Sequence, residues 1–553
     1  MFAIVGLLII LFCSFQAVLS GYKPDWASID SRPLPVWYDE AKFGIFSHWG
    51  VYSVPAFGSE WFWWYWKGQH DPKYEQFVEK HYPNGTTYAD FAKFFTAADF
   101  DANNYAEIVK ASGARYFVLT SKHHEGFTLW PSTTSWNWNA VDVGPHRDLV
   151  KAFSEATRAQ NVHFGLYFSL FDWFHPLYLN DIKTHRTDFV QSVSFPQLLE
   201  IVNEYHPEVI WSDGDWEQPD TYWRSKEFLA WLYNESPVKE KVVVNDRWGR
   251  GISGKHGGFL TYQDHYDPGR LLSRKWENCL TLDKRSWGYR RYLKPSDVLS
   301  LAELISQLAR TISCGGNMLL NVGPDHTGRI VPIFEQRLRE FGQWVTINTE
   351  AIYGRQRFLL FLLLASSPNY TFSKAWVHQS DGPTIWYTSQ MRNSTELSPH
   401  RMYNPQQTFN TIVYAFVLSI PRTGRIKFPS VHLTDKTVVS IVGTSTKVPY
   451  KKGETSLSVD ISGIPWQDLP STVSIVLKIE FAASSQINPL RTATESDSSG
   501  DDDDDASSTE EGNNAVSGKG NSALSGTGNE RTRGQDEGRR YGQMMELVSA
   551  TDE

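Results

Sequence analysis

Cysteine is scarce in this chain, which contains 3 cysteines in 553 residues. Cys13 lies in an apolar N-terminal stretch, and its removal with that stretch would leave Cys279 and Cys314. Two cysteines do not make the disulfide framework of a small secreted domain. The fold must therefore rest on an apolar core, which 41% hydrophobic residues can supply. The sequence does not decide whether Cys279 and Cys314 are bonded.

The chain also lacks an excess of charge of one sign before its C-terminal end. Of 62 acidic and 53 basic residues, 15 and 6 lie in residues 484–553, which leaves 47 of each before them. A neutral body argues against binding nucleic acid. Residues 484–553 have too little apolar content to fold, so we expect a disordered acidic tail. The run Asp501–Asp505 could bind calcium, but like-charge repulsion favours a solvated tail.

Apolar runs long enough to cross a bilayer are missing as well. The run Phe2–Phe15 is short for a span and is followed by small residues, which predicts a signal peptide over residues 1–20. A retained anchor is the alternative, because no Lys or Arg precedes the run. The run Phe358–Ala365 is shorter still and is interpreted as a buried insertion or an error in the gene model.

The sequons of this chain are consistent with export. A signal peptide and sequons together predict a secreted or lysosomal protein without a stable membrane anchor. The candidate glycosylation sites are Asn84, Asn234, Asn369 and Asn393.

Short apolar runs alternate with helical stretches from about Lys42 to Pro324. Runs that are apolar throughout are typical of parallel strands buried on both faces. The alternation predicts an α/β barrel or an open α/β sheet, and polar residues at the ends of many runs favour the barrel. The predicted strands lie within 43–50, 116–124, 163–169, 209–215, 242–248 and 317–324, and the predicted helices are 147–160, 194–205 and 295–313.

The pattern changes after about Tyr353. Short β-branched runs at Ile412–Ile420, Thr437–Val442 and Thr472–Phe481 predict an antiparallel β-sandwich. The predicted organisation is a signal peptide (1–20), a catalytic barrel (21–355), a β-sandwich (356–483) and a disordered tail (484–553).

Two acidic positions stand out by their neighbours in the sequence. Asp213 directly follows an apolar run, although Asp215 and Glu217 are so near that spacing alone does not choose among them. A helix cap or a salt bridge would explain these acids equally well. Glu277 follows Trp276, and burial beside an indole would raise the pKa of its carboxyl, as a general acid requires. A retaining glycosidase uses one carboxylate as nucleophile and a second as acid/base.

Histidines and aromatic residues supply further candidates. His48 and the pair His123–His124 could bind a metal, but adjacent histidines on a strand would point to opposite faces, so sugar hydroxyls fit better. Glu60 stands beside Trp61 in an aromatic segment, where a buried carboxylate needs a partner. The 22 tryptophans are consistent with stacking on sugars, and also with a large core.

Seven motifs occur in order along the chain: FGIFSHWG, SEWFWWYW, KHHEGF, VIWSDG, VVNDRWG, KWENC with SWGYRR, and GGNMLLNVGP. Together they resemble glycoside hydrolase family 29, the α-L-fucosidases, and are most similar to the animal tissue and plasma enzymes. The resemblance spans roughly residues 22–353. It implies a (β/α)8-like barrel, a C-terminal β-sandwich, and net retention through a covalent fucosyl-enzyme.

The resemblance also implies roles for individual residues. Asp213 would be the nucleophile and Glu277 the acid/base. No metal or organic cofactor is implied, the substrates would be fucosylated glycans and glycoproteins, and a homo-oligomer is compatible. The alternatives are a fucose-binding lectin-like protein and a metallohydrolase using His123 and His124. The implied fucose-binding residues are His48, Glu60, Trp61, His123, His124, Tyr167, Trp211 and Arg247.

Overall fold

The computed structural model describes residues 21–354, 372–393, 398–444, 446–451, 455–486 and 488–490. The predicted signal peptide, the run Phe358–Ala365, the sequon at Asn369 and the acidic run Asp501–Asp505 lie outside these residues. Within the described ranges, none of the helices has the length and apolar character that a membrane crossing requires.

A seven-stranded parallel sheet forms the first part of the chain, in the order β5-β4-β3-β2-β1-β7-β6. Six of its strands lie in the predicted apolar runs, and nearly every residue in them is buried, as expected for strands covered on both faces. The strand β6 was not predicted. The bounds are β1 (Phe43–Ser47), β2 (Tyr116–Lys122), β3 (His163–Ser169), β4 (Val209–Asp213), β5 (Val243–Val244), β6 (Glu277–Thr281) and β7 (Asn317–Val322).

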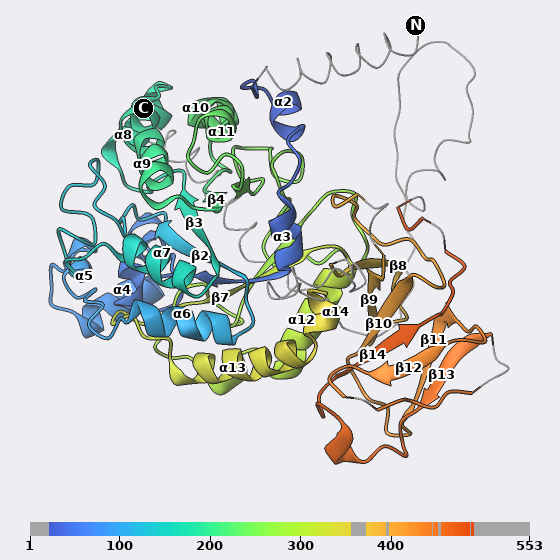
Figure 1. Cartoon of the computed structure of the whole chain (residues 1–553). Coiled ribbons are helices and arrows are strands. Elements are labelled where there is room, and N and C mark those ends of the chain that lie inside the picture. The colour runs from blue at the N-terminus through green and yellow to red at the C-terminus, as the bar shows by residue number, and fades with distance from the viewer. Residues whose placement is uncertain are drawn as a thin grey trace, which may run out of the picture. The chain divides into compact units, whose positions relative to one another are not determined.

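Helices follow the strands and pack against them, for example α7 against β2 and β3 and α12 against β7 (Figure 1). The start of α12 is a capping box in which Ser300 and Glu303 satisfy each other's backbone N–H groups. Its end is followed by Gly315, whose φ of 78° is in the left-handed region that favours glycine after a helix. The helices are α2 (Trp26–Asp30), α3 (Val36–Ala41), α4 (Pro72–His81), α5 (Ala89–Ala92), α6 (Ala102–Ala111), α7 (Leu149–Ala159), α8 (Pro176–Thr184), α9 (Phe195–Tyr205), α10 (Asp220–Trp223), α11 (Ser225–Asn234), α12 (Leu301–Ser313), α13 (Pro332–Ile347) and α14 (Thr349–Ile352).

The segment 258–261 joins the two edges of the curled sheet. On one side Phe259 N donates to Val244 O next to β5, over 3.1 Å. On the other side Leu260 N donates to Lys275 O, and Glu277 N donates to Leu260 O, both over 2.9 Å. These bonds satisfy backbone groups that an open sheet edge would leave unpaired. The arrangement confirms a (β/α)8-like barrel, with this short segment between β5 and β6.

The second part is an antiparallel β-sandwich, as predicted. A five-stranded sheet (β12-β14-β10-β9-β8) faces a two-stranded sheet (β11-β13). Inward-facing residues of both sheets, such as Trp376, Phe428 and Leu477, form one buried core. The two remaining cysteines, Cys279 and Cys314, are buried and not bonded to each other. The strands are β8 (Lys374–Ser380), β9 (Ile385–Met391), β10 (Thr411–Val417), β11 (Arg425–His432), β12 (Val438–Ile441), β13 (Ser456–Asp460) and β14 (Ile475–Glu480).

Candidate active site

Asp213 is the last residue of β4 and lies at the carboxyl end of the barrel strands, where barrel enzymes place their chemistry. Tyr167 on β3 donates from its hydroxyl to Oδ2 over 2.8 Å. Arg247, shortly after β5, donates from Nη1 to Oδ1 over 3.1 Å. Each carboxylate oxygen of Asp213 thus has a donor, and its side chain is 11% exposed. These two contacts fix the orientation of the Asp213 carboxylate.

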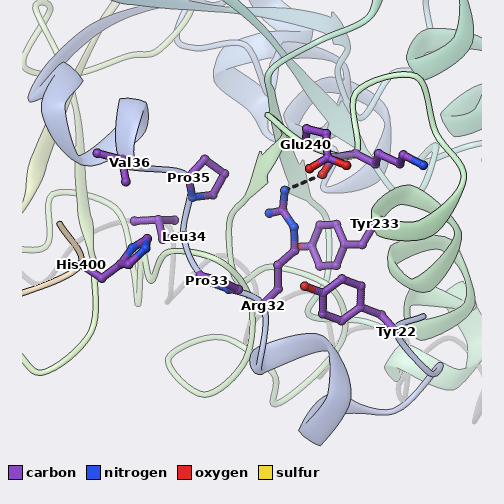
Figure 2. A pocket seen from close by; sticks show the side chains of 10 residues that line it. Tyr22, Arg32, Pro33, Leu34, Pro35, Val36, Tyr233, Glu240 and His400 are labelled. Atoms are coloured by element: carbon purple, nitrogen blue, oxygen red, sulfur yellow. Dashed lines mark hydrogen bonds between the residues drawn. The ribbon is translucent and has the colours of Figure 1, made fainter. Parts of the chain in front are cut away.

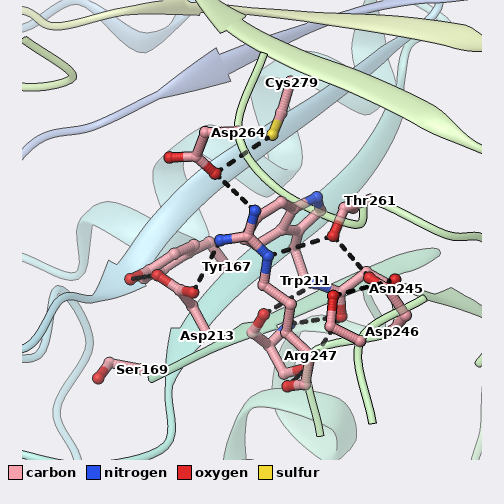
Figure 3. Close-up of polar contacts among 12 residues, drawn as sticks. Tyr167, Ser169, Trp211, Asp213, Asn245, Asp246, Arg247, Thr261, Asp264 and Cys279 are labelled. Carbon is pink, nitrogen blue, oxygen red and sulfur yellow. Dashed lines mark hydrogen bonds and ion pairs between the residues drawn. The ribbon is translucent and has the colours of Figure 1, made fainter. Parts of the chain in front are cut away.

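Arg247 lies between two carboxylates (Figure 3). Besides Asp213, it contacts Asp264, whose Oδ1 lies 2.5 Å from Nη2. Its Nε donates to Thr261 Oγ1 over 3.1 Å, and its guanidinium lies 4.6 Å from the centroid of a Trp211 ring. Burial alone would lower the pKa of Arg247, but Asp264 and Asp213 raise it well above its usual range. The guanidinium is therefore a fixed positive charge shared by Asp213 and Asp264.

His124 lies on the other side of Asp213. Its Nδ1 is 2.7 Å from Ser169 Oγ, and that hydroxyl donates to Phe171 O over 2.6 Å. Because the Ser169 proton is used, Nδ1–H must be the donor to Ser169. Burial lowers the pKa of His124 well below its usual range, so the ring is neutral and Nε2 is an acceptor. This Nε2 faces Asp213 Oδ2 at 3.6 Å, which places two acceptors where one ligand hydroxyl can reach both.

His48 and His123 lie close to the same group. Asn321 Oδ1 is 2.8 Å from His48 Nδ1, and the amide of Asn321 donates to Trp287 O, so the His48 Nδ1 is a donor. The His123 ring stacks with Tyr167 at 5.7 Å. The rings of His123 and His124 are only 4.1 Å apart, so the prediction that they point to opposite faces is wrong. The reason is that β2 ends at Lys122 and strand alternation stops there.

Glu60 and Trp61 complete the predicted set. Glu60 Oε2 accepts from the backbone N–H groups of Trp287 and Gly288, over 3.1 and 3.0 Å. Trp61 lies 5.5 Å from His124 between ring centroids. The partner of the buried Glu60 carboxylate is thus the backbone of the loop after β6. Among the residues that the structure describes, no group of three or more His, Cys, Asp or Glu could hold a metal ion.

Glu277 is placed differently from the prediction. It is the first residue of β6, whereas Asp213 is the last residue of β4, so the two lie at opposite ends of parallel strands. It is fully buried, and its carboxylate accepts from Tyr38, Tyr116 and Trp211. Burial raises the pKa of Glu277, and these three donors oppose that effect. A carboxylate enclosed in this way cannot reach a leaving group, which contradicts the predicted acid/base role.

Two other carboxyl groups lie near Arg247 and Asp213. Asp264 is in the loop between 261 and β6, and its side chain is 27% exposed. The thiol of Cys279 lies 3.7 Å from its Oδ1. Asp215 is buried, and desolvation raises its pKa to about 8. Asp264 was not predicted because no strand precedes it; its only signal in the sequence is an acid between the NDRWG and KWENC motifs.

The sequons differ in their surroundings. Asn84 and Asn393 are exposed. Asn234 is half-buried at the end of α11, where its Nδ2 donates to Tyr22 O and its Oδ1 accepts from Tyr22 N, each over 2.8 Å. Beside this contact is a cavity of about 410 Å³, lined among others by Tyr22, Arg32 and Tyr233 (Figure 2). It contains none of the predicted site residues and is not the candidate active site.

Comparisons with known proteins show the family to which the chain belongs. A family model described as alpha-L-fucosidase matches residues 10–350, and one described as the alpha-L-fucosidase C-terminal domain matches residues 379–480. The sequence is 54% identical over 480 residues to a putative alpha-L-fucosidase of Caenorhabditis elegans, covering 86% of this chain and 96% of that protein. It is 46% identical over 463 residues to the tissue alpha-L-fucosidase of Homo sapiens, covering 83% and 91%.

A solved structure shares the fold. The alpha-fucosidase of Thermotoga maritima in complex with a mechanism-based inhibitor matches with a TM-score of 0.64 and 30% identity. The match covers 83% of this chain and 99% of that one.

Proposed function

Because this chain belongs to the retaining α-L-fucosidases of glycoside hydrolase family 29, we propose that Asp213 is its nucleophile and Asp264 its acid/base. The observation that supports this assignment is the shared contact with Arg247, whose Nη1 and Nη2 bond Asp213 and Asp264. One guanidinium thus holds both carboxyl groups close to each other. A retaining glycosidase requires a separation of about 5–5.5 Å.

In the first step, an Asp213 oxygen attacks the anomeric carbon of α-L-fucose while the bond from that carbon to the leaving oxygen breaks. Asp264 gives its proton to the departing oxygen. In the second step, Asp264 removes a proton from water, and the water oxygen displaces Asp213 from the anomeric carbon. Two displacements on opposite faces give net retention. Tyr167 and Arg247 hold the nucleophile in place, so the attacking geometry exists before the sugar binds.

Asp264 fits the acid/base role better than Asp215 or Glu277. Its side chain is about a quarter exposed, so a glycan attached to fucose can reach it. Asp215 has the higher pKa, at about 8, but it is buried. The contact of Asp264 with Arg247 also places it beside the group that holds the nucleophile.

The remaining polar side chains are proposed to bind the fucose hydroxyl groups. Nε2 of the neutral His124 and Oδ2 of Asp213 can share one hydroxyl proton, because both are acceptors 3.6 Å apart. His48 and His123 are proposed to contact further hydroxyls, with Trp61 against the apolar edge of the sugar. Glu60 is proposed to contribute to the fucose site through the loop at Trp287 and Gly288, whose backbone N–H groups donate to it.

The substrates are fucosylated glycans, and we propose that terminal α-L-fucose of glycoproteins and oligosaccharides is removed. The relatives named above include a tissue enzyme, and others are plasma enzymes, as in Rattus norvegicus. We therefore propose a secreted or lysosomal location, a signal peptide at 1–20, a barrel at 21–355, a sandwich at 356–483 and a separate tail. A homo-oligomer without a membrane anchor is part of the same proposal.

The test is hydrolysis of a chromogenic aryl α-L-fucoside by the purified protein, with aryl β-galactoside and α-mannoside as controls. We expect turnover of the fucoside alone, and proton NMR should show α-L-fucose as the first-formed anomer. Binding of fucose without turnover would instead support the lectin-like alternative. First-formed β-L-fucose would contradict a retaining mechanism.

A further inference from the structure

Glu277 is buried at the start of β6, and three side chains donate hydrogen bonds to its carboxylate. The hydroxyls of Tyr38 and Tyr116 both lie 2.6 Å from Oε2. Contacts of this length are typical of a hydroxyl that donates to an ionised carboxylate. The Nε1 of Trp211 lies 2.9 Å from Oε1, and an indole N–H can only donate. The network therefore fixes one edge of the Trp211 ring from inside the barrel.

The Trp211 ring in turn contacts both groups that donate to Asp213. The guanidinium carbon of Arg247 lies 4.6 Å from a Trp211 ring centroid. The Tyr167 ring stacks on Trp211 with centroids 5.8 Å apart and an interplanar angle of 20°. Trp211 and Asp213 are two residues apart on β4, so their side chains leave the same face of the strand. A displaced indole would therefore shift Arg247 or Tyr167 relative to the nucleophile.

We propose that Glu277 is a positioning residue for the nucleophile and acts through Trp211, which rests on the proposed role of Asp213. Its carboxylate holds the indole, and the indole supports Arg247 and Tyr167 against Asp213. Glu277 transfers no proton to the leaving group. The physical reason is a continuous series of contacts from Glu277 to Asp213, in which each contact is a hydrogen bond or a ring contact between buried or half-buried groups.

The experiment compares Glu277→Ala and Glu277→Gln on an activated aryl α-L-fucoside and an unactivated alkyl α-L-fucoside. Glu277→Ala should lower kcat by about 10²-fold, the typical cost of a misplacement of about 1 Å. The loss should be the same on both substrates, because leaving-group protonation is untouched. Glu277→Gln should stay within about tenfold of the parent, because its amide oxygen still accepts from Trp211 and only the charge of the contact is lost.

A double-mutant cycle tests the route through Trp211. Trp211→Phe removes the N–H that Glu277 accepts, so the double variant should be no slower than Trp211→Phe alone. Trp276→Phe is the matched control, since the Trp276 Nε1 donates to Cys314 O over 2.8 Å and this control leaves Trp211 intact. It loses a buried hydrogen bond of the same kind, and its kcat should fall by less than about threefold.

Two results would overturn the proposal. One is a much larger fall in the kcat of Glu277→Ala on the alkyl than on the aryl fucoside, together with restored turnover in azide that yields α-L-fucosyl azide. That result would make Glu277 the acid/base. The other is a double variant whose fall in kcat equals the product of the falls in its two single variants, Trp211→Phe and either Glu277→Gln or Glu277→Ala. If Glu277→Ala does not fold, the Gln and Phe variants still complete the cycle. Failure of the proposed function gives a different result, namely full activity in Asp213→Gly.

Discussion

Replacing Asp264 with Ala removes the carboxyl group that we assign to leaving-group protonation. General acid catalysis typically contributes about 10²–10⁴-fold. At 1.36 kcal/mol per tenfold, this is a barrier increase of about 2.7–5.4 kcal/mol. We expect that loss for an alkyl fucoside or a fucosylated oligosaccharide, whose leaving oxygen is strongly basic. An aryl fucoside with a nitro-substituted leaving group departs without a proton, so the first step should slow by less than about tenfold.

Protein stability should change little in this variant. The Asp264 side chain is 27% exposed and Arg247 keeps its ion pair with Asp213, so the loss of the Asp264 carboxyl should cost about 0–1 kcal/mol. The assay is steady-state kinetics on the aryl and alkyl substrates, with and without azide. Azide needs no base, so it should attack the fucosyl-enzyme on Asp213 and give α-L-fucosyl azide. Asp215→Asn is the matched control and should show no azide rescue.

The reasoning would be refuted by equal losses on the two substrates together with no azide product. In that case the Asp264 carboxyl would only position Arg247 through the contact at Nη2. Azide rescue in Asp215→Asn instead would assign the acid/base role to the buried neighbour of Asp213, whose pKa of about 8 already favours the protonated form.

Further predictions concern stability. Asn234→Ala removes two hydrogen bonds to the Tyr22 backbone and should lower the free energy of unfolding, measured by urea titration, by about 1–3 kcal/mol. The control Asn84→Gln changes an exposed residue and should not lower it. Equal urea midpoints for Asn234→Ala and the parent would contradict the contact. Asp215 has a pKa raised from 3.8 to about 8, so the folded state keeps a proton that the unfolded state has lost, and stability should fall as pH rises between these values. Asp215→Asn should remove this fall, so the melting temperature of the variant minus that of the parent should increase from pH 5 to pH 8. The same difference in melting temperature at both pH values would contradict the raised pKa of Asp215. Truncation after Ala483 should leave the melting temperature nearly unchanged, because the pair of Ala483 with His432 is the last backbone pair of the sandwich among the residues that the structure describes. A fall of several degrees would mean that the boundary is misplaced.

The sequence predicted much of the fold because buried parallel strands are apolar at every position. The strand β6 shows why the prediction was incomplete. Its residues Glu277 and Asn278 are polar, and Glu277 is acceptable in the interior only because Tyr38, Tyr116 and Trp211 donate to it. These partners are 239, 161 and 66 residues away in the chain, so no local pattern shows them.

The candidate site was predicted where its residues follow a strand. Asp213 ends an apolar run, and its position at the carboxyl end of β4 follows directly from that pattern. Glu277 is an acid beside an indole, as a general acid could be, but it is the first residue of its strand. It therefore lies about 13 Å from the carboxyl end of β6. Asp264 lies in an irregular loop, and only its contact with Arg247 shows that it belongs to the site. Residue type was thus a weaker guide than position on the strand.

The central claim is that Asp213 attacks the sugar, and covalent trapping tests it most directly. A 2-deoxy-2-fluoro-α-L-fucosyl fluoride should form the fucosyl-enzyme quickly and release it slowly, because fluorine at C2 destabilises the charge that develops during both steps. Peptide mapping by mass spectrometry should then find one fluorofucosyl group per chain, on Asp213 in the peptide that contains VIWSD. A label on Asp215, Asp264 or Glu277, or complete inactivation of the enzyme without any label, would contradict the account.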